Sequence, residues 1–100
     1  MSRRTYKIET IVINELSVHH VVVDDHYMVK HSDHISDELI LELVKLLNGI
    51  DQQPDKSIRG FSYFVNLLMF DKKQYRLIWL LEDNQIYIGV INAYRDDRRE

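Results

Sequence analysis

Alternating apolar and polar residues predict two β-strands at the start of the chain. Residues 6–13 alternate almost without interruption, which is the period of a strand. An unbroken alternation puts Ile8 and Ile11 on opposite faces. Residues 18–23 are rich in β-branched side chains and predict a second strand. Residues 14–15 between them are typical of a turn, so we expect a hairpin, or one of these strands pairing alone with a larger sheet.

The pattern changes to a helical period after Ser36. A serine here is a favourable N-cap, and the acidic residues 37–38 that follow suit the positive end of the helix dipole. Apolar residues recur three and four positions apart along one stripe. They are Leu39, Ile40, Leu43, Val44 and Leu47. Gly49 is placed to end the helix as its C′ residue, so the pattern predicts a helix between Ser36 and Gly49.

The segments on either side of this helix are less regular. Asp24 ends the second strand, and residues 25–31 fit a short helix with an acidic first turn. Residues 27–29 fit an extended segment as well, so both conformations stay open. Residues 51–60 are polar and contain Pro54, which predicts a loop.

Three more strands are predicted after this loop. They cover residues 61–70, 75–82 and 85–94, with polar turns between them. Both faces of the strand at 75–82 are largely apolar, so we expect one face to pack on the helix and the other to be covered by the N-terminal strands or by a partner. The expected fold class is a single α+β domain over residues 1–100, with N-terminal strands, one or two helices and a three-stranded antiparallel meander packed on the helix.

Composition narrows the function classes. A chain of 100 residues with 45% hydrophobic residues can bury a core. It has no cysteine, which excludes disulfides, cysteine-ligated metals and a thiol nucleophile. No apolar run approaches the ~18 residues of a membrane helix and none follows the basic start, so we expect a cytoplasmic protein that does not bind a membrane. The net charge of −3 argues against nucleic-acid binding by bulk charge, and the three glycines form no phosphate-binding loop.

All five histidines lie within residues 19–34, and three interpretations of them are open. The first is a metal site, but His19 and His20 would point to opposite faces of a strand, and no two histidines lie four residues apart. We therefore expect neither a metal nor another cofactor. The second is structural, because half-buried histidines and strand arginines paired with acids are common without any site.

The third interpretation is acid–base catalysis. In a helix over residues 25–31, His26 and Lys30 share a face, and His31 follows them. An imidazole beside a fixed cation can move protons and stabilise charge on phosphorus during RNA cleavage.

Arginines on the predicted strands would complete such a site. Arg76 and Arg95 are expected on neighbouring strands, where their guanidinium groups can hold a phosphate. Tyr94 lies next to Arg95 at a strand end, in a position to contact a base.

The second half of the chain resembles the RelE/ParE-like toxins of the barnase–colicin–RelE superfamily. Those toxins end in a helix and three strands, with a tyrosine–arginine pair before an apolar strand, an acidic turn and a basic end. The corresponding stretches here are residues 58–61, 75–79, 82–84 and 86–95. The middle of the chain is similar to related small domains of the same superfamily, through residues 26–31 and 35–39.

The resemblance implies a small metal-independent ribonuclease toxin with an antitoxin protein as its partner, or a gyrase poison as in the ParE branch. The residues that it implies for acid–base chemistry and phosphate binding are His26, Lys30, His31, Arg76 and Arg95. Tyr94 and Arg59 are the residues expected to contact the RNA substrate.

A different function class stays open beside the ribonuclease. The apolar second face of the predicted sheet suits an interface, so the same fold can serve as a protein-interaction module or a homodimer.

Overall fold

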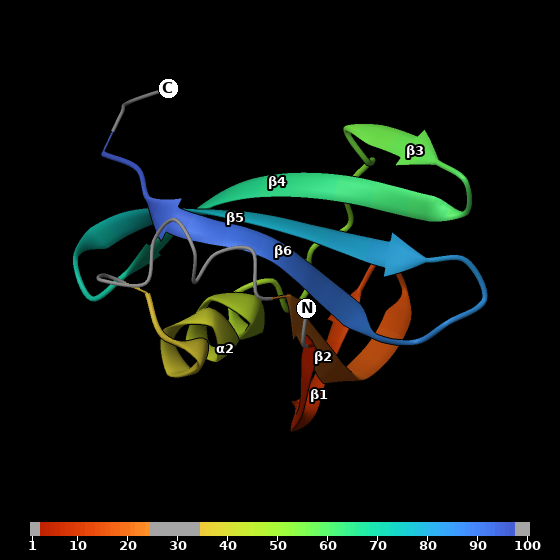
Figure 1. Cartoon of the computed structure of the whole chain (residues 1–100), viewed down its shortest axis with the longest axis horizontal. Coiled ribbons are helices and arrows are strands. Elements are labelled where there is room, and N and C mark those ends of the chain that lie inside the picture. Colours follow the sequence, from red (N-terminus) through yellow and green to blue (C-terminus); the bar gives the residue numbers. More distant parts are fainter. Residues whose placement is uncertain (1–2, 25–34, 98–100) are drawn as a thin grey trace.

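The described part of the chain is a six-stranded sheet with one helix packed on one face. The computed structural model describes residues 3–24 and 35–97. The strands are β1 (Arg3–Ile13), β2 (Leu16–Asp24), β3 (Lys56–Ile58), β4 (Phe61–Phe70), β5 (Lys73–Glu82) and β6 (Ile88–Arg95), and the helix is α2 (Asp37–Lys45). The strand order across the sheet is β1-β2-β6-β5-β4-β3. Neighbouring strands are antiparallel except β2 and β6, which run parallel (Figure 1).

The expected α+β fold, with a three-stranded meander packed on the helix, is therefore wrong. Strands predominate in residues 3–24 and 35–97, and α2 has nine residues. The N-terminal hairpin belongs to the same sheet because β2 pairs with β6, and β3 adds an edge inside the segment expected to be a loop. Pairing between segments far apart in the chain leaves no mark on local periodicity. Among the described residues no helix has the length and apolar character needed to cross a bilayer.

The helix begins where the sequence indicates and ends earlier. The Ser36 hydroxyl accepts a hydrogen bond from Leu39 N at 3.1 Å, which confirms the N-cap and contributes ~1 kcal/mol. After Lys45 the backbone bonds become the tighter kind between residues three apart, such as the one that Asn48 N donates to the Lys45 carbonyl at 3.2 Å. These turns continue to Gly49, where a φ of 90° reverses the chain.

Two-residue turns close three hairpins in the part of the chain that the structure describes. Both residues of each turn have positive φ, as the turns that match the twist of a hairpin require. These residues are Asn14 and Glu15, Arg59 and Gly60, and Asp71 and Lys72, with φ between 48° and 87°. Such short turns fix the register of the strands that they join.

A bulge in β1 changes which of its side chains face the core. The register of the β1–β2 pair shifts between Lys7 and Ile11, so β1 carries extra residues there. The core-facing positions change parity here on both strands, from Ile8 to Ile11 on β1 and from Val18 to Val21 on β2. Ile8 therefore packs against the core on the same side as the buried Ile11, and the expected opposite placement of these two side chains is wrong.

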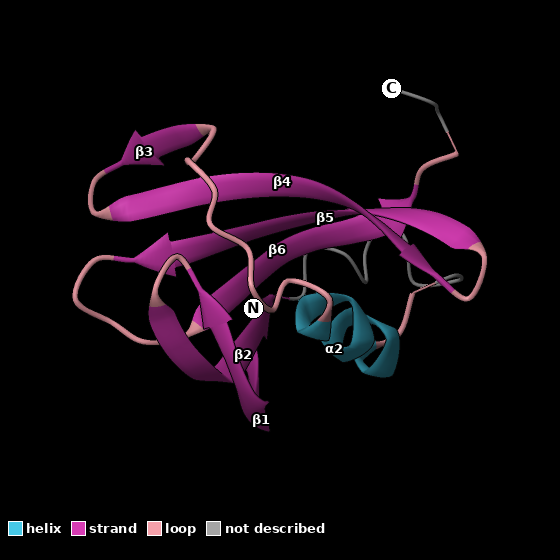
Figure 2. Cartoon of the chain, turned by 180° about the vertical axis from the view of Figure 1, so that it is seen from behind, coloured by secondary structure: helices cyan, strands magenta, loops and turns pink. Residues whose placement is uncertain are grey.

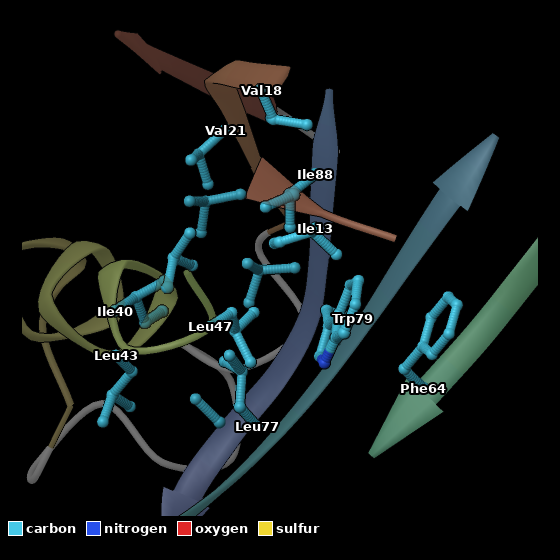
Figure 3. Close-up of a cluster of buried hydrophobic side chains, with 14 of the residues drawn as sticks. Ile13, Val18, Val21, Ile40, Leu43, Leu47, Phe64, Leu77, Trp79 and Ile88 are labelled. Atoms are coloured by element: carbon cyan, nitrogen blue, oxygen red, sulfur yellow. The ribbon is translucent and has the colours of Figure 1, made fainter. Parts of the chain in front are cut away.

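The helix covers one face of the sheet, which we call the inner face. Ile40 and Leu43 of α2 belong to the same buried cluster as Leu77 and Trp79 of β5. Leu47, just after α2, lies between the helix and Trp79 (Figure 3). Trp79 is fully buried and stacks on Phe64 of β4, with ring centroids 4.2 Å apart and planes inclined by 12°. Aromatic stacking of this kind adds ~1 kcal/mol to the burial of the two rings.

A chain of amide hydrogen bonds fixes the loop after α2 to the sheet. Trp79 Nε1 donates to Asn66 Oδ1 at 2.8 Å, and Asn66 Nδ2 donates to Gln52 Oε1 at 2.9 Å. The Asn14 side chain accepts from Gln52 N and donates to the Gln52 carbonyl, at 2.7 and 2.9 Å. This network satisfies the buried indole and holds the helix and its loop on the same side of β4, β5 and β6 (Figure 2).

The opposite side of the sheet, the outer face, carries a second set of apolar residues. Residues directly opposite each other in paired strands share a face, and successive residues alternate. Ile78 pairs with Val65 and Leu80 with Tyr63, one step out of phase with the buried Trp79. We define the outer face by Val22, Tyr63, Val65, Ile78, Leu80 and Ile91, all of them only partly buried.

Candidate functional site

Part of the expected catalytic group lies outside the described residues. His26, Lys30 and His31 belong to residues 25–34, and so does the expected short helix at 25–31. Their predicted roles in acid–base chemistry stay predictions.

The two expected phosphate-binding arginines do not share a face. Arg76 is the cross-strand partner of Tyr94, whereas Arg95 is the partner of Tyr75 on the neighbouring register position. Tyr75 is buried on the inner face, so Arg76 and Tyr94 lie on the outer face and Arg95 on the inner one. The structure brings Arg76 and Tyr94 together and separates both from Arg95.

Arg76 is held by a buried carboxylate. Its Nε donates to Asp96 Oδ2 at 2.7 Å, and the side chains are 19% and 2% exposed. Asp96 is itself fixed by Gln74, whose carbonyl accepts from Asp96 N at 3.0 Å and whose amide donates to the Asp96 carbonyl at 2.8 Å. The Arg76 guanidinium is therefore oriented by an internal ion pair at the end of β5 and β6.

Arg95 makes surface contacts instead. Its Nη2 donates to Asp97 Oδ1 at 2.8 Å, and this bond raises the pKa of the guanidinium further. The guanidinium carbon lies 5.9 Å from the centre of the Tyr75 ring. An exposed pair of this kind contributes little to stability.

Arg59 lies at the other end of the sheet. It belongs to the turn between β3 and β4, beside Phe61, which pairs with Glu82. Arg76 pairs with Leu67, six residues further along β4, which corresponds to about 20 Å of strand. Arg59 therefore does not join Arg76 and Tyr94 in one site.

His19 and His20 lie side by side, contrary to expectation. Their ring centroids are 4.4 Å apart, whereas side chains on opposite faces of a regular strand diverge. They stand opposite the bulge of β1, which disturbs the alternation at this point. Within residues 3–24 and 35–97 no cluster of three or more histidine, aspartate or glutamate side chains is arranged to hold a metal ion.

The outer face contains two adjoining hollows. One has a volume of about 270 Å³ and is floored by Val22, Leu80 and Gly89, and the other has about 440 Å³ and is walled by Val65 and Ile78. Ile91 lines both hollows, so they lie on either side of this residue.

Gly89 gives the first hollow its floor. A Cβ atom at Gly89 would lie 2.8 Å from Leu80 Cδ1 and 3.0 Å from Leu80 Cγ, which is too close for van der Waals contact. The absence of a side chain therefore allows Leu80 to lie across β6.

Charged and polar side chains stand at the margin of the hollows. The Tyr87 hydroxyl donates to Glu82 Oε1 at 2.6 Å, and Arg3 and Asp24 line the same hollow from β1 and β2. Burial, and then the bond to Glu82, raises the pKa of Tyr87 to about 12, although Arg3 acts in the opposite direction. Lys56 stands at the far margin, with its ammonium 5.5 Å from the centre of the Tyr63 ring.

From the sequence, Asp37 is expected only to suit the positive end of the helix dipole, and the structure adds a second role. Its carboxylate binds Arg4 of β1 through Nε at 2.5 Å and Nη2 at 3.0 Å, and it accepts a hydrogen bond from the Tyr6 hydroxyl. That bond raises the pKa of Tyr6. The contact ties the start of α2 to β1, and no periodicity in the sequence signals it.

Comparisons of the chain with family models, with curated proteins and with solved structures each gave no match.

Proposed function

We propose that this chain is a protein-interaction module whose outer face is the binding surface. The observation that carries the proposal is the layout of that face, an apolar centre over four neighbouring strands with charged groups at its margin. An apolar centre with a polar rim is the usual anatomy of a protein–protein interface.

The contrast between the two faces of β5 supports this. Leu77 and Trp79 on the inner face are fully buried under α2. Ile78 and Leu80 on the same strand have equally apolar side chains but keep part of their surface exposed in the described structure. A contiguous exposed apolar face is unusual on a monomer and marks a surface that a partner covers.

The hollows give such a partner places to insert side chains. Binding energy in interfaces concentrates where a side chain fills a well-packed pocket and excludes water. The two hollows share Ile91 as a lining residue, so one partner surface can reach both.

A second function, RNA binding with cleavage, is favoured by one observation. Arg76 and Tyr94 are cross-strand neighbours at one end of the outer face, and Asp96 fixes the guanidinium. A guanidinium beside an aromatic ring suits the phosphate and base of a single RNA strand. The ribonuclease reaction stays a prediction, and this geometry leaves Arg95 out of it.

The test of the interaction function compares two variants of the full chain that place a charge on different sides. Ile78→Asp charges the centre of the outer face, and Leu46→Asp charges an apolar side chain that is 44% exposed in the turn after α2. We expect association, with a second copy or with another polypeptide, to be lost in Ile78→Asp and kept in Leu46→Asp. Association that both variants keep, or none at all in the unmodified chain, contradicts the proposal.

A further inference from the structure

We propose that Asn48 is a site of spontaneous deamidation that β1 keeps closed in the folded protein. This modification converts asparagine to aspartate or isoaspartate and needs only water. The inference does not depend on the proposed interaction function. It is carried by the sequence at residues 48–49 and by the hydrogen bonds that join these residues to Val12 of β1.

The residue that follows Asn48 makes this asparagine more reactive than the others in the chain. Deamidation begins when the backbone nitrogen of the next residue attacks the side-chain carbonyl carbon, and a side chain on that next residue hinders the attack. Only Asn48 precedes a glycine, which has no Cβ atom. The asparagines that precede a residue with a side chain are Asn14, Asn66, Asn84 and Asn92.

The reaction is balanced with water as its single reagent. The Gly49 nitrogen forms a bond to Asn48 Cγ, the bond from Cγ to the side-chain nitrogen breaks, and the proton from Gly49 N leaves with the ammonia through solvent. Water then opens the resulting cyclic imide at either carbonyl carbon. One opening gives aspartate, and the other gives isoaspartate, whose main chain runs through the side-chain carboxyl carbon and is longer by a methylene group.

Both reacting groups are held by Val12 in the folded protein. Val12 N donates to Asn48 Oδ1 at 2.8 Å, and Gly49 N donates to the Val12 carbonyl at 2.7 Å. Residues 48–49 therefore cover the edge of β1 at this point much as a neighbouring strand would. The nucleophile and the carboxamide are both engaged, so the ring closes only when this contact opens.

The site is open to water and lies where local opening is easiest. Asn48 and Gly49 are both exposed, and a Cβ atom at Gly49 would meet no atom of the described residues within 4 Å. β1 is an edge strand, so the contact at Val12 can open while the rest of the sheet stays paired (Figure 1). The stability of this contact therefore sets the rate of the modification.

The two products have different consequences for the fold. Aspartate keeps an oxygen where Asn48 Oδ1 accepts from Val12 N, so it preserves the contact. The longer main chain of isoaspartate moves Gly49 N away from the Val12 carbonyl. Isoaspartate at this position therefore releases the segment after α2 from β1.

The rate is measured by peptide mapping of the full chain during incubation at mildly alkaline pH, with and without denaturing urea. We expect deamidation of Asn48 to be slower in the folded chain by about tenfold or more, because it requires local opening. Val12→Pro removes the donor to Asn48 Oδ1 and should bring the rate close to that in urea. Val12→Ala keeps both backbone groups and should match the unmodified chain.

A second variant loosens the same contact without a proline. Asn14→Gly keeps the positive φ of its turn but removes the side-chain bonds to Gln52 that hold the loop after Gly49. We expect its rate to exceed that of the unmodified chain, with circular dichroism showing that it is folded. Equal rates in the folded and unfolded chain, or faster reaction at another asparagine in urea, overturn the proposal.

Hydrogen exchange at the Val12 amide tests the release by isoaspartate. The two products are separated by chromatography and compared with the unmodified chain. We expect exchange at Val12 to be faster by about tenfold or more in the isoaspartate form and unchanged in the aspartate form. Equal exchange in the isoaspartate form and the unmodified chain overturns the proposed release.

Discussion

Arg76 and Arg95 lie on neighbouring strands but on opposite faces of the sheet. The first stands opposite Tyr94 and the second opposite the buried Tyr75. A guanidinium pair that closes on one phosphate needs both groups on the same side. The cleft expected from the resemblance to ribonuclease toxins is therefore not formed by these two arginines, whereas Arg76 and Tyr94 remain together.

The first prediction concerns RNA. If the chain binds RNA at the Arg76 end of the outer face, Tyr94→Ala should weaken RNA binding about tenfold, because a stacked base contributes ~1–3 kcal/mol. Arg95→Ala should leave it unchanged, since that side chain lies on the inner face. Binding to a labelled single-stranded RNA measures both, and loss in Arg95→Ala with none in Tyr94→Ala would refute this placement.

The second prediction concerns the ion pair of Arg76. Replacing Arg76 by alanine leaves the Asp96 carboxylate, 2% exposed, without this partner. We expect the free energy of unfolding to fall by about 2–4 kcal/mol, as for other half-buried pairs that lose one member. Urea unfolding measures it. Arg95→Ala is the matched control and should change stability little, because its partner Asp97 is exposed. Equal losses in the two variants would contradict an orienting role of Asp96.

The third prediction concerns the floor of the outer face. Gly89→Ala places a Cβ 2.8 Å from Leu80 Cδ1, so Leu80 must move and stability should fall by about 1–2 kcal/mol. Leu80→Ala removes the clashing atoms, so the double variant should lose less than the two single changes added together. Thermal or urea unfolding of the four proteins gives the coupling. Additive losses would show that Leu80 does not lie over Gly89.

The fourth prediction concerns alkaline pH. Burial and the bond to Glu82 raise the pKa of Tyr87 from 10.0 to about 12, so the folded protein holds the phenol proton more tightly than the unfolded chain. This contribution to stability is complete below pH 10 and is lost as the pH rises through about 12. Tyr87→Phe lacks it.

The measurement for Tyr87 is a pair of unfolding series across this pH range. The wild-type chain should lose stability more steeply than Tyr87→Phe between pH 10 and 12. Other tyrosines and the lysines titrate in both proteins, so the difference between the two series isolates Tyr87. Parallel curves would mean that this hydroxyl is as solvated as in the unfolded chain.

Local features of the fold were predictable from the sequence, because a few neighbouring residues determine them. Ser36 caps the helix as expected, and the turn at residues 14–15 and the strand Phe61–Phe70 are where the pattern places them. The apolar second face was readable from residues 75–82, since both alternating rows there are apolar.

Features that depend on distant contacts were not predictable in this way. The parallel pairing of β2 with β6 joins segments separated by the helix and three strands, and it makes one sheet out of two expected pieces. The bulge near Ile8 reverses faces without a glycine or proline to signal it. The face on which Arg76 lies follows from the strand register. The burial of Asp96 beside it depends instead on the path of the chain after β6, where Asp96 N bonds to the Gln74 carbonyl.

The accessibility of individual methyl groups to a soluble paramagnetic probe, followed by NMR, tests the role of the outer face most directly. In the dilute chain we predict that Ile78 is broadened by the probe, whereas Ile40 beneath the sheet is not. At concentrations where the chain associates, Ile78 should become protected while the exposed Leu46 stays broadened. Protection of Ile78 already in the monomer, or continued broadening in the associated state, would contradict an outer face that serves as the binding surface.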